Sequence, residues 1–259
     1  MANLGFITGS GFYAHAAAAL APRTVATPFG AVTVTHGRLH GHAVTHLARH
    51  GRGHERLSHQ VEHRANLWAL HELGVQAIVA ATAVGLLAAD VPLGVPLLFD
   101  DLYFPSNRLP DGSPATVFTT PGDPHRGRER RALLERAARG AGIAAAAGGC
   151  YAHADGPRFN TAAEHRALRQ AGATAVSQTC GPEAVLAGEL EIPYALVGFG
   201  VNRVTGLGLP ETGEACLAEL LAAHGPAVGG LFDAFLAGLP SDAVFPLDTG
   251  AVFRIQTEG

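Results

Sequence analysis

Short apolar runs alternate with amphipathic stretches along most of this chain of 259 residues. Apolar, β-branched runs bounded by turn residues predict strands, whereas apolar residues that recur every three or four positions predict helices. The predicted strands are residues 4–8, 31–35, 42–49, 76–83, 96–100, 175–179 and 193–201, with one or two more within 143–153. This alternation is typical of an α/β fold with a largely parallel sheet.

The predicted helices fall between these strands. They are residues 59–73, 127–139, 161–170 and 182–190, and the segment 211–239 has the pattern of two amphipathic helices. Residues 104–125 are rich in Pro, Gly and Asp and form the longest irregular stretch. Because no long polar or charge-rich segment interrupts the apolar pattern, we predict a single domain over residues 1–259.

The charged residues exclude several classes of function. The formal net charge is −4, so a protein that binds nucleic acid or an anionic membrane, which needs a basic excess, is not expected. The sequence contains no lysine, and all 18 basic residues are arginines. Schiff-base chemistry, attachment of pyridoxal phosphate and a P-loop all require lysine, so all three are excluded. An anion must therefore be held by Arg, His, hydroxyl groups or backbone amides.

Three widely spaced cysteines, Cys150, Cys180 and Cys216, form no Cys-x-x-Cys pair. A sparse, odd set is typical of reduced thiols in a cytoplasmic protein. The first residues lack the basic region of a secretory signal, and no apolar stretch reaches the length that spans a membrane. We therefore expect a soluble protein in the cytoplasm.

Two segments that follow predicted strands have the composition of an anion site. Residues 9–11, Gly-Ser-Gly, give backbone amides room to approach an anion, and Ser10 adds a hydroxyl group. A plain tight turn has the same pattern. Two Arg and two His lie within residues 49–54, where an α/β sheet usually binds its ligand. These side chains suit phosphate, and a solvated loop is the alternative.

Metal sites and nucleophiles have little support. The 14 histidines are scattered, and they form neither an HExxH helix nor the His-x-Glu plus Cys-x-x-Cys pattern of zinc deaminases, so no metal is expected. No Gly-x-Ser-x-Gly motif marks a hydrolase nucleophile. Cys180, in the segment Thr-Cys-Gly-Pro-Glu, is expected to be a buried and inert thiol.

Two further positions can present polar groups to a ligand. The turn at residues 155–160 places the aromatic ring of Phe159 beside the amide of Asn160. Asn202 ends a long apolar strand, where an amide without partners would be costly to bury. From the sequence alone, a strand-end cap explains Asn202 equally well.

Taken in order, several segments resemble the purine nucleoside phosphorylase and methylthioadenosine phosphorylase family. The matching stretches are collinear over residues 4–205. They are Gly9-Ser10-Gly11, Ala48-Arg49-His50-Gly51-x-x-His54, Val61-x-x-Arg64-Ala65-Asn66-Leu67-Trp68-Ala69-Leu70, Ala81-Thr82-Ala83-Val84-Gly85, Gly156-Pro157-Arg158-Phe159-x-Thr161-x-x-Glu164, Thr179-x-x-Pro182-Glu183-x-x-Leu186-Ala187 and Val201-Asn202. Each stretch is short, but seven in the right order make a specific match.

This resemblance implies a mixed, twisted sheet flanked by helices, and a homotrimer with active sites near the subunit boundaries. It also implies an enzyme that cleaves a purine nucleoside with inorganic phosphate as co-substrate and uses no metal or organic cofactor. The residues implied to hold phosphate are Ser10, Arg49, His50, Thr82, Ala83 and Thr179. Those implied to contact the base and the sugar are Phe159, Asn160, Gln178 and Asn202. The implied catalytic residues are Asn202 and His50.

Position 202 bears on which purine is cleaved. In the family that the chain resembles, members that act on 6-aminopurines carry Asp here, often with a second Asp two residues later. Members that act on 6-oxopurines carry Asn, whose amide can donate to both N7 and O6. This chain has Asn202 and Val204. We therefore predict cleavage of inosine, guanosine or 5'-methylthioinosine before adenosine.

The chain departs from the family pattern at four positions. Gln178 stands where the family usually has Met under the ribose, and Asn160 where the 6-oxopurine enzymes usually have Glu. His63 replaces a commoner Tyr, and Leu86 replaces a usual Gly or Ser. The alternatives are a methylthioadenosine or adenosine phosphorylase, a phosphorylase for a specialised modified nucleoside, a nucleoside hydrolase, and a non-catalytic nucleoside-binding protein.

Overall fold

A computed structural model describes residues 1–9, 20–51, 53–115, 142, 144–208 and 214–245. Within this part of the chain, one sheet contains eleven strands: β1 (Asn3–Thr8), β2 (Ala21–Thr27), β3 (Gly30–Leu39), β4 (His42–Ala48), β5 (Ala77–Leu86), β6 (Pro96–Leu98), β7 (Asp101–Tyr103), β8 (Ala146–Ala147), β9 (Cys150–His153), β10 (Ala173–Ser177) and β11 (Tyr194–Arg203). The described helices are η1 (Ser58–Gln60), α1 (His63–Glu72), α3 (Ala162–Gln170), α4 (Cys180–Glu189) and α5 (Glu214–Ala237).

The centre of the sheet is parallel and its margins are mixed. Strand β1 lies parallel between β4 and β5, and β5 is also parallel to β11. On one side, β2, β3 and β4 form an antiparallel meander. On the other side, β10 is antiparallel to β5, and β9 and β7 follow in parallel. Strand β6 joins β11 antiparallel and β8 parallel. The mixed sheet confirms the predicted fold class.

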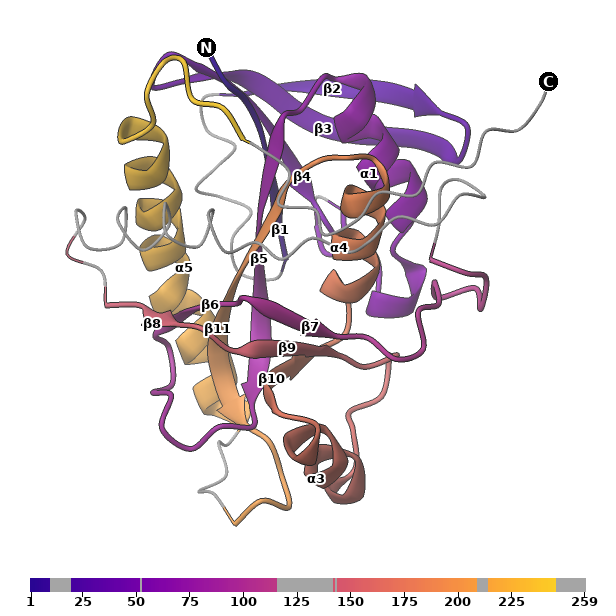
Figure 1. The fold of residues 1–259 in the computed structure, drawn as a ribbon, viewed down its shortest axis with the longest axis vertical. Coiled ribbons are helices and arrows are strands. Elements are labelled where there is room, and N and C mark those ends of the chain that lie inside the picture. The colour runs from indigo at the N-terminus through magenta and orange to yellow at the C-terminus, as the bar shows by residue number, and fades with distance from the viewer. Residues whose placement is uncertain (10–19, 52, 116–141, 143, 209–213, 246–259) are drawn as a thin grey trace.

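Helices cover both faces of this sheet, α5 on one face and the α1–α4 pair on the other (Figure 1). Neighbouring residues of β1 point to opposite faces, as the alternation of a strand requires. The ring of Phe6 lies 4.7 Å from that of Phe232 in α5. Ile7 belongs instead to the core cluster that includes Leu70 of α1 and Leu186 of α4. The parallel centre of the sheet is therefore buried on both sides.

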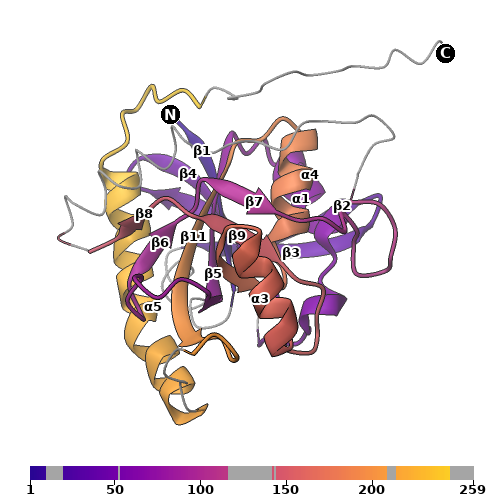
Figure 2. The same ribbon diagram turned by 60° about the horizontal axis from the view of Figure 1, so that its bottom comes forward.

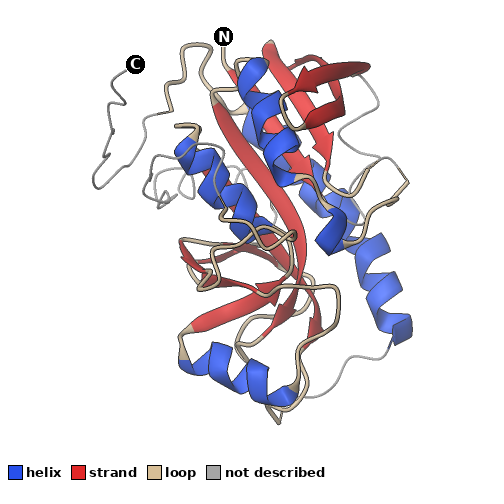
Figure 3. Cartoon of the chain, turned by 90° about the vertical axis from the view of Figure 1, so that its right-hand side faces the viewer, coloured by secondary structure: helices blue, strands red, loops and turns tan. Residues whose placement is uncertain are grey.

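Helix α3 lies beside β10, at the end of the molecule that is lowest in Figures 1 and 3 and faces the viewer in Figure 2. Its N-terminus is fixed by a capping box, because Thr161 Oγ1 accepts from the backbone N–H of Glu164 while the Glu164 carboxylate accepts from the N–H of Thr161. The predicted helix at residues 161–170 is confirmed, and its first residue is the cap. This cap fixes the end of the turn that carries Phe159.

Several predicted boundaries are wrong. Residues 214–239, the described part of the segment 211–239, contain one helix, α5, because the apolar face continues past Pro226 to Val228 and Leu231. Helix α1 begins at His63 instead of residue 59, since Val61 has an extended backbone after η1. Strand β2 was not predicted, because most of its side chains are exposed and show no apolar alternation.

Some predictions lie outside the described residues, namely the helix at 127–139, Ser10 and the side chain of Cys216. Within the described part, no helix combines the length and the apolar character needed to cross a membrane.

Candidate active site

The carboxyl ends of β1 and β4 meet the middle of β5. The backbone N–H of Arg49 donates to the carbonyl of Thr8 at 2.9 Å, and the N–H of Gly9 donates to the carbonyl of Ala81 at 3.2 Å. Gly9 at the end of β1, the residues Arg49 and His50 after β4, and the segment of β5 that includes Thr82 therefore lie side by side. Ligands of α/β proteins usually bind at this edge of the sheet.

Arg49 is held by a buried carboxylate to which the sequence assigned no role. Arg49 and Glu183, in the first turn of α4, are each 1% exposed. Nε and Nη2 of Arg49 donate to the two carboxylate oxygens of Glu183, and Nη1 donates to the carbonyl of Ala81 at 3.0 Å. The hydroxyl of Tyr194 donates to Glu183 Oε2 at 2.9 Å. This bidentate pair fixes the guanidinium and balances its charge.

Because residue 9 is glycine, the backbone at the end of β1 lies directly against Arg49. A Cβ atom at position 9 would lie 2.7 Å from Arg49 Nη1, which is too close for any side chain. A residue other than glycine would therefore displace either the backbone at position 9 or the guanidinium. Arg49 thus lies at the start of the Gly-Ser-Gly segment, where the sequence predicted an anion.

His50 is buried next to Arg49, and its tautomer follows from one hydrogen bond. Nδ1 lies 2.9 Å from the carbonyl oxygen of Arg56. A carbonyl only accepts, so Nδ1 carries the proton and Nε2 is the acceptor of the neutral ring. Burial, reinforced by the charge of Arg49, lowers the pKa of His50 to about 4. At neutral pH, His50 therefore offers an acceptor at Nε2.

Two more histidines, His63 and His153, are buried close to this cluster. Both ring nitrogens of His63 and the Nδ1 of His153 lack a hydrogen-bond partner. Burial lowers the pKa of His63 well below its usual value, and nearby His153 and Arg49 lower it further. The ring of His153 packs against Phe104, with 4.5 Å between the ring centres. Burial therefore keeps two imidazoles at this site, those of His50 and His63, neutral at pH 7.

We expect the folded state to lose stability as the pH falls from about 6.5 towards 4. Above pH 6.5, His50 and His63 are neutral in both the folded and the unfolded chain and contribute nothing. Below it, the unfolded chain binds protons that the folded chain, with its lowered pKa values, does not. Urea unfolding at several pH values measures this slope.

The His63→Phe variant should show a shallower decline in stability with falling pH, because one of the two depressed pKa values is removed. His59→Gln, at an exposed histidine, is the matched control and should follow the parent chain. Equal slopes for His63→Phe and the parent would contradict the role assigned to His63.

Thr82 and Thr179 bring two buried hydroxyl groups to the same edge of the sheet. Thr82 Oγ1 donates to the carbonyl of Ala83 at 3.2 Å and lies 3.4 Å from Ser177 Oγ. Thr179 precedes α4, but its side chain makes no cap hydrogen bond to that helix. Its Oγ1 lies 3.7 Å from the sulfur of Cys180. These hydroxyls can serve a bound anion as donors.

Cys180 is fully buried, as the sequence predicted for an inert thiol. Its backbone N–H donates to the hydroxyl of Tyr151 at 3.1 Å, and burial raises the pKa of its thiol. A thiol with a raised pKa and no exposure is a poor nucleophile.

The predicted base-binding residues lie on β11 and on an exposed turn. Asn202 pairs with Gly85 of β5 just past a register shift, and its Nδ2 donates to the carbonyl of Arg203 at 3.3 Å. The ring of Phe159 is 85% exposed, and Asn160 next to it is half-buried. The strand pairing brings Asn202 to the strand that carries Thr82, whereas Phe159 stands out from the surface.

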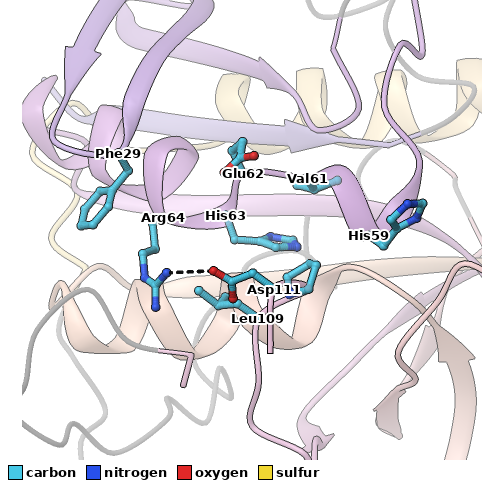
Figure 4. Close-up of a pocket in the computed structure, with 9 residues that line it drawn as sticks. Phe29, His59, Val61, Glu62, His63, Arg64, Leu109 and Asp111 are labelled. Atoms are coloured by element: carbon cyan, nitrogen blue, oxygen red, sulfur yellow. Dashed lines mark ion pairs between the residues drawn. The ribbon is translucent and has the colours of Figure 1, made fainter. Parts of the chain in front are cut away.

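A pocket of about 210 Å³ lies beside this cluster, between the start of α1 and residues 109–111 (Figure 4). It is lined by Phe29, His59, Val61, Glu62, His63, Arg64, Leu109, Pro110 and Asp111. An ion pair of 3.7 Å between Arg64 and Asp111 crosses it. His63 connects the pocket to the cluster of Arg49 and His50, because the charges of these two residues contribute to the lowered pKa of His63.

The fold is that of a nucleoside phosphorylase. The structure matches that of an adenosine/methylthioadenosine phosphorylase mutant from Schistosoma mansoni with a TM-score of 0.83 and 24% identity, over 92% of this chain and 91% of that chain. The chain belongs to the phosphorylase superfamily, whose profile matches residues 3–221. This confirms the family that the sequence predicted.

Two relatives of known sequence are more similar to this chain than that structure is. The chain is 36% identical to a 6-oxopurine nucleoside phosphorylase of Pyrococcus furiosus, over 85% of this chain and 87% of the relative. It is 39% identical to a probable S-methyl-5'-thioinosine phosphorylase of Methanopyrus kandleri, over 80% of this chain and 81% of the relative.

Proposed function

We propose that this chain is a purine nucleoside phosphorylase, a pentosyltransferase that cleaves a 6-oxopurine nucleoside or 5'-methylthioinosine with inorganic phosphate. The relatives named for 6-oxopurine nucleosides and methylthioinosine support this activity. The observation that carries it is the convergence of Gly9, Arg49 and Thr82 at one edge of the sheet, beside the strand that pairs with Asn202.

Phosphate is held mainly by neutral donors at this edge. The charge of Arg49 is balanced by Glu183, and His50 is neutral at pH 7. Backbone amides after β1 and the hydroxyls of Thr82 and Thr179 supply the hydrogen bonds, with Ser10 and Ala83 as further contacts. His50 accepts through Nε2, so it favours a protonated phosphate oxygen. Bound phosphate then stabilises the sugar cation that forms as the glycosidic bond lengthens, and attacks its anomeric carbon.

Asn202 acts on the departing base. The purine becomes electron-rich as the bond breaks, and an amide donor at N7 stabilises that charge most strongly in the transition state. Within the described part of the chain, the Asn202 amide has a single hydrogen bond, of 3.3 Å, so it can turn towards a base. Phe159 and Asn160, on the turn at residues 156–160, contact the other parts of the base.

The predictions of a homotrimer and a cytoplasmic location remain part of this proposal. The exposed ring of Phe159 fits a site that is completed at a subunit boundary.

Within the described residues, no group of three or more His, Cys, Asp or Glu side chains is arranged to hold a metal ion. Members of this family use phosphate as the co-substrate. The chemistry above needs only the side chains already described and phosphate.

The test is the release of free base from inosine, guanosine, adenosine and their 5'-methylthio forms, each with and without phosphate. We expect release from the 6-oxopurine substrates only when phosphate is present. Release without phosphate would identify a hydrolase, and preferential release of adenine would identify a methylthioadenosine or adenosine phosphorylase. Binding without turnover would identify a nucleoside-binding protein.

A further inference from the structure

Gln178 replaces the Met that the resembling family usually carries under the ribose, and both its amide oxygen and its amide nitrogen form a hydrogen bond within the protein. Oε1 accepts a hydrogen bond from the hydroxyl of Ser58 at 2.9 Å. Nε2 donates to the backbone carbonyl of Arg158 at 2.8 Å. One side chain, positioned by the end of β10, therefore connects two segments that are far apart in the sequence.

The backbone at Gly156 packs directly against this connection. A Cβ atom at position 156 would collide with Gln178 Oε1, Gln178 Cδ and Ser58 Oγ. The turn therefore reaches the Gln178 amide closely only because residue 156 is glycine. Three segments meet here: residues 57–60, the turn at 156–160 and the start of the loop before α4.

The far end of the same turn is fixed independently. The guanidinium of Arg158 donates to both carboxylate oxygens of Glu164, at 2.9 and 2.6 Å, and Glu164 also accepts from the N–H of Thr161. These contacts lower the pKa of Glu164 to about 2, with the Arg158 hydrogen bond as the largest cause. Phe159 is thus held between an anchor on α3 and the Gln178 amide, although its ring is exposed.

We infer that Gln178 is a positioning residue that ties the base-binding turn, with Phe159 and Asn160, to the segment that follows the Arg49-His50 cluster. It acts through the turn, because the hydrogen bonds to Ser58 and Arg158 fix the orientation of its amide. A methionine at this position would pack but could not make this tie. The inference rests on the proposed function for its effect on nucleoside binding, whereas the tie itself does not depend on activity.

Three variants separate the effects of the two hydrogen bonds that Gln178 makes, one with Ser58 and one with Arg158. Gln178→Met removes both hydrogen bonds, Gln178→Glu keeps the acceptor for Ser58 but loses the donor to Arg158, and Ser58→Ala removes only the bond to Ser58. Hydrogen exchange of the backbone amides at residues 156–161 and 57–60 is measured on the full chain, together with the KM values for nucleoside and phosphate and with kcat.

We expect Gln178→Met and Gln178→Glu to raise the exchange rates at 156–161 and the nucleoside KM by roughly five- to tenfold, the effect of one lost hydrogen bond. The phosphate KM and kcat should stay within about twofold of the parent, a split that a general loss of structure would not give. Ser58→Ala, the matched control, should raise exchange only at 57–60.

Unchanged hydrogen-exchange rates at residues 156–161 in Gln178→Met would show that Gln178 does not hold the turn, whether or not the chain is active. Raised exchange with an unchanged nucleoside KM would overturn the positioning role. If the parent chain cleaves no nucleoside, the proposed function fails, and the exchange comparison still decides whether Gln178 holds the turn.

Discussion

Replacing Glu183 with glutamine is expected to destabilise the fold by about 3–5 kcal/mol, because it leaves the charge of Arg49 buried without its counter-charge. Both side chains are almost completely buried, and Arg49 directs two of its nitrogens at the carboxylate. Tyr194 donates to the same carboxylate. In glutamine an NH2 group replaces one of the two carboxylate oxygens, so a donor would face another donor, either Arg49 or Tyr194. The pair joins β4 to α4, and its loss affects the centre of the molecule.

Urea unfolding of Glu183→Gln at pH 7 measures this effect. Glu72→Gln, at an exposed position of α1, is the control, and its stability should change by less than about 0.5 kcal/mol. Any Glu183→Gln protein that remains folded should also bind phosphate more weakly, because the guanidinium is no longer fixed. A loss of stability below about 1 kcal/mol would show that the pair is not the anchor inferred here.

Strongly apolar elements could be predicted from the sequence, because their own residues determine them. The runs that became β1, β5 and β11 are buried on both faces, so their apolar character is nearly continuous. Strand β2 has mostly exposed side chains, and its strand conformation comes from pairing with β3. Such a strand leaves no apolar alternation to detect.

The partners of the predicted site residues could not be derived from local patterns. Arg49 was singled out as an anion-binding residue, but its carboxylate partner is 134 positions away. Glu183 carried only a weak signal, an acidic residue in the first turn of a mostly apolar helix. Gln178 was recognised as unusual, yet its contact with Ser58, 120 positions away, exists only in the folded chain. Residue types at a site can be predicted from sequence, whereas their pairing depends on the topology.

Asn202→Ala is expected to lower kcat for inosine or 5'-methylthioinosine by on the order of a hundredfold, about 3 kcal/mol, the effect of losing one donor to a developing charge. Asn202 is the proposed donor to N7, and among the described residues its amide has one hydrogen bond, a long one to the carbonyl of Arg203. Alanine therefore removes a catalytic group without leaving a buried partner unsatisfied. The fold should stay within a few tenths of a kcal/mol of the parent.

Steady-state kinetics and thermal unfolding of the same preparation separate these two effects. Thr205→Ala, at an exposed residue three positions further along the chain, is the control and should leave both kcat and stability unchanged. If Asn202→Ala retains most of the parent activity, Asn202 is a strand-end cap and the donor to the base lies elsewhere.

Asn202→Asp tests specificity at the same position. The space beside the amide comes from Gly85, where a Cβ atom would lie 2.8 Å from Val204 Cγ1 and 3.5 Å from Asn202 Oδ1. Aspartate has nearly the same shape as asparagine and fits this space, but its carboxylate only accepts hydrogen bonds. It should therefore disfavour a 6-oxo group and favour a 6-amino group, which donates. We expect the ratio of kcat/KM for inosine to that for adenosine to fall by at least tenfold, about 1.4 kcal/mol. An unchanged ratio would mean that position 202 does not select the base, whatever its role in catalysis.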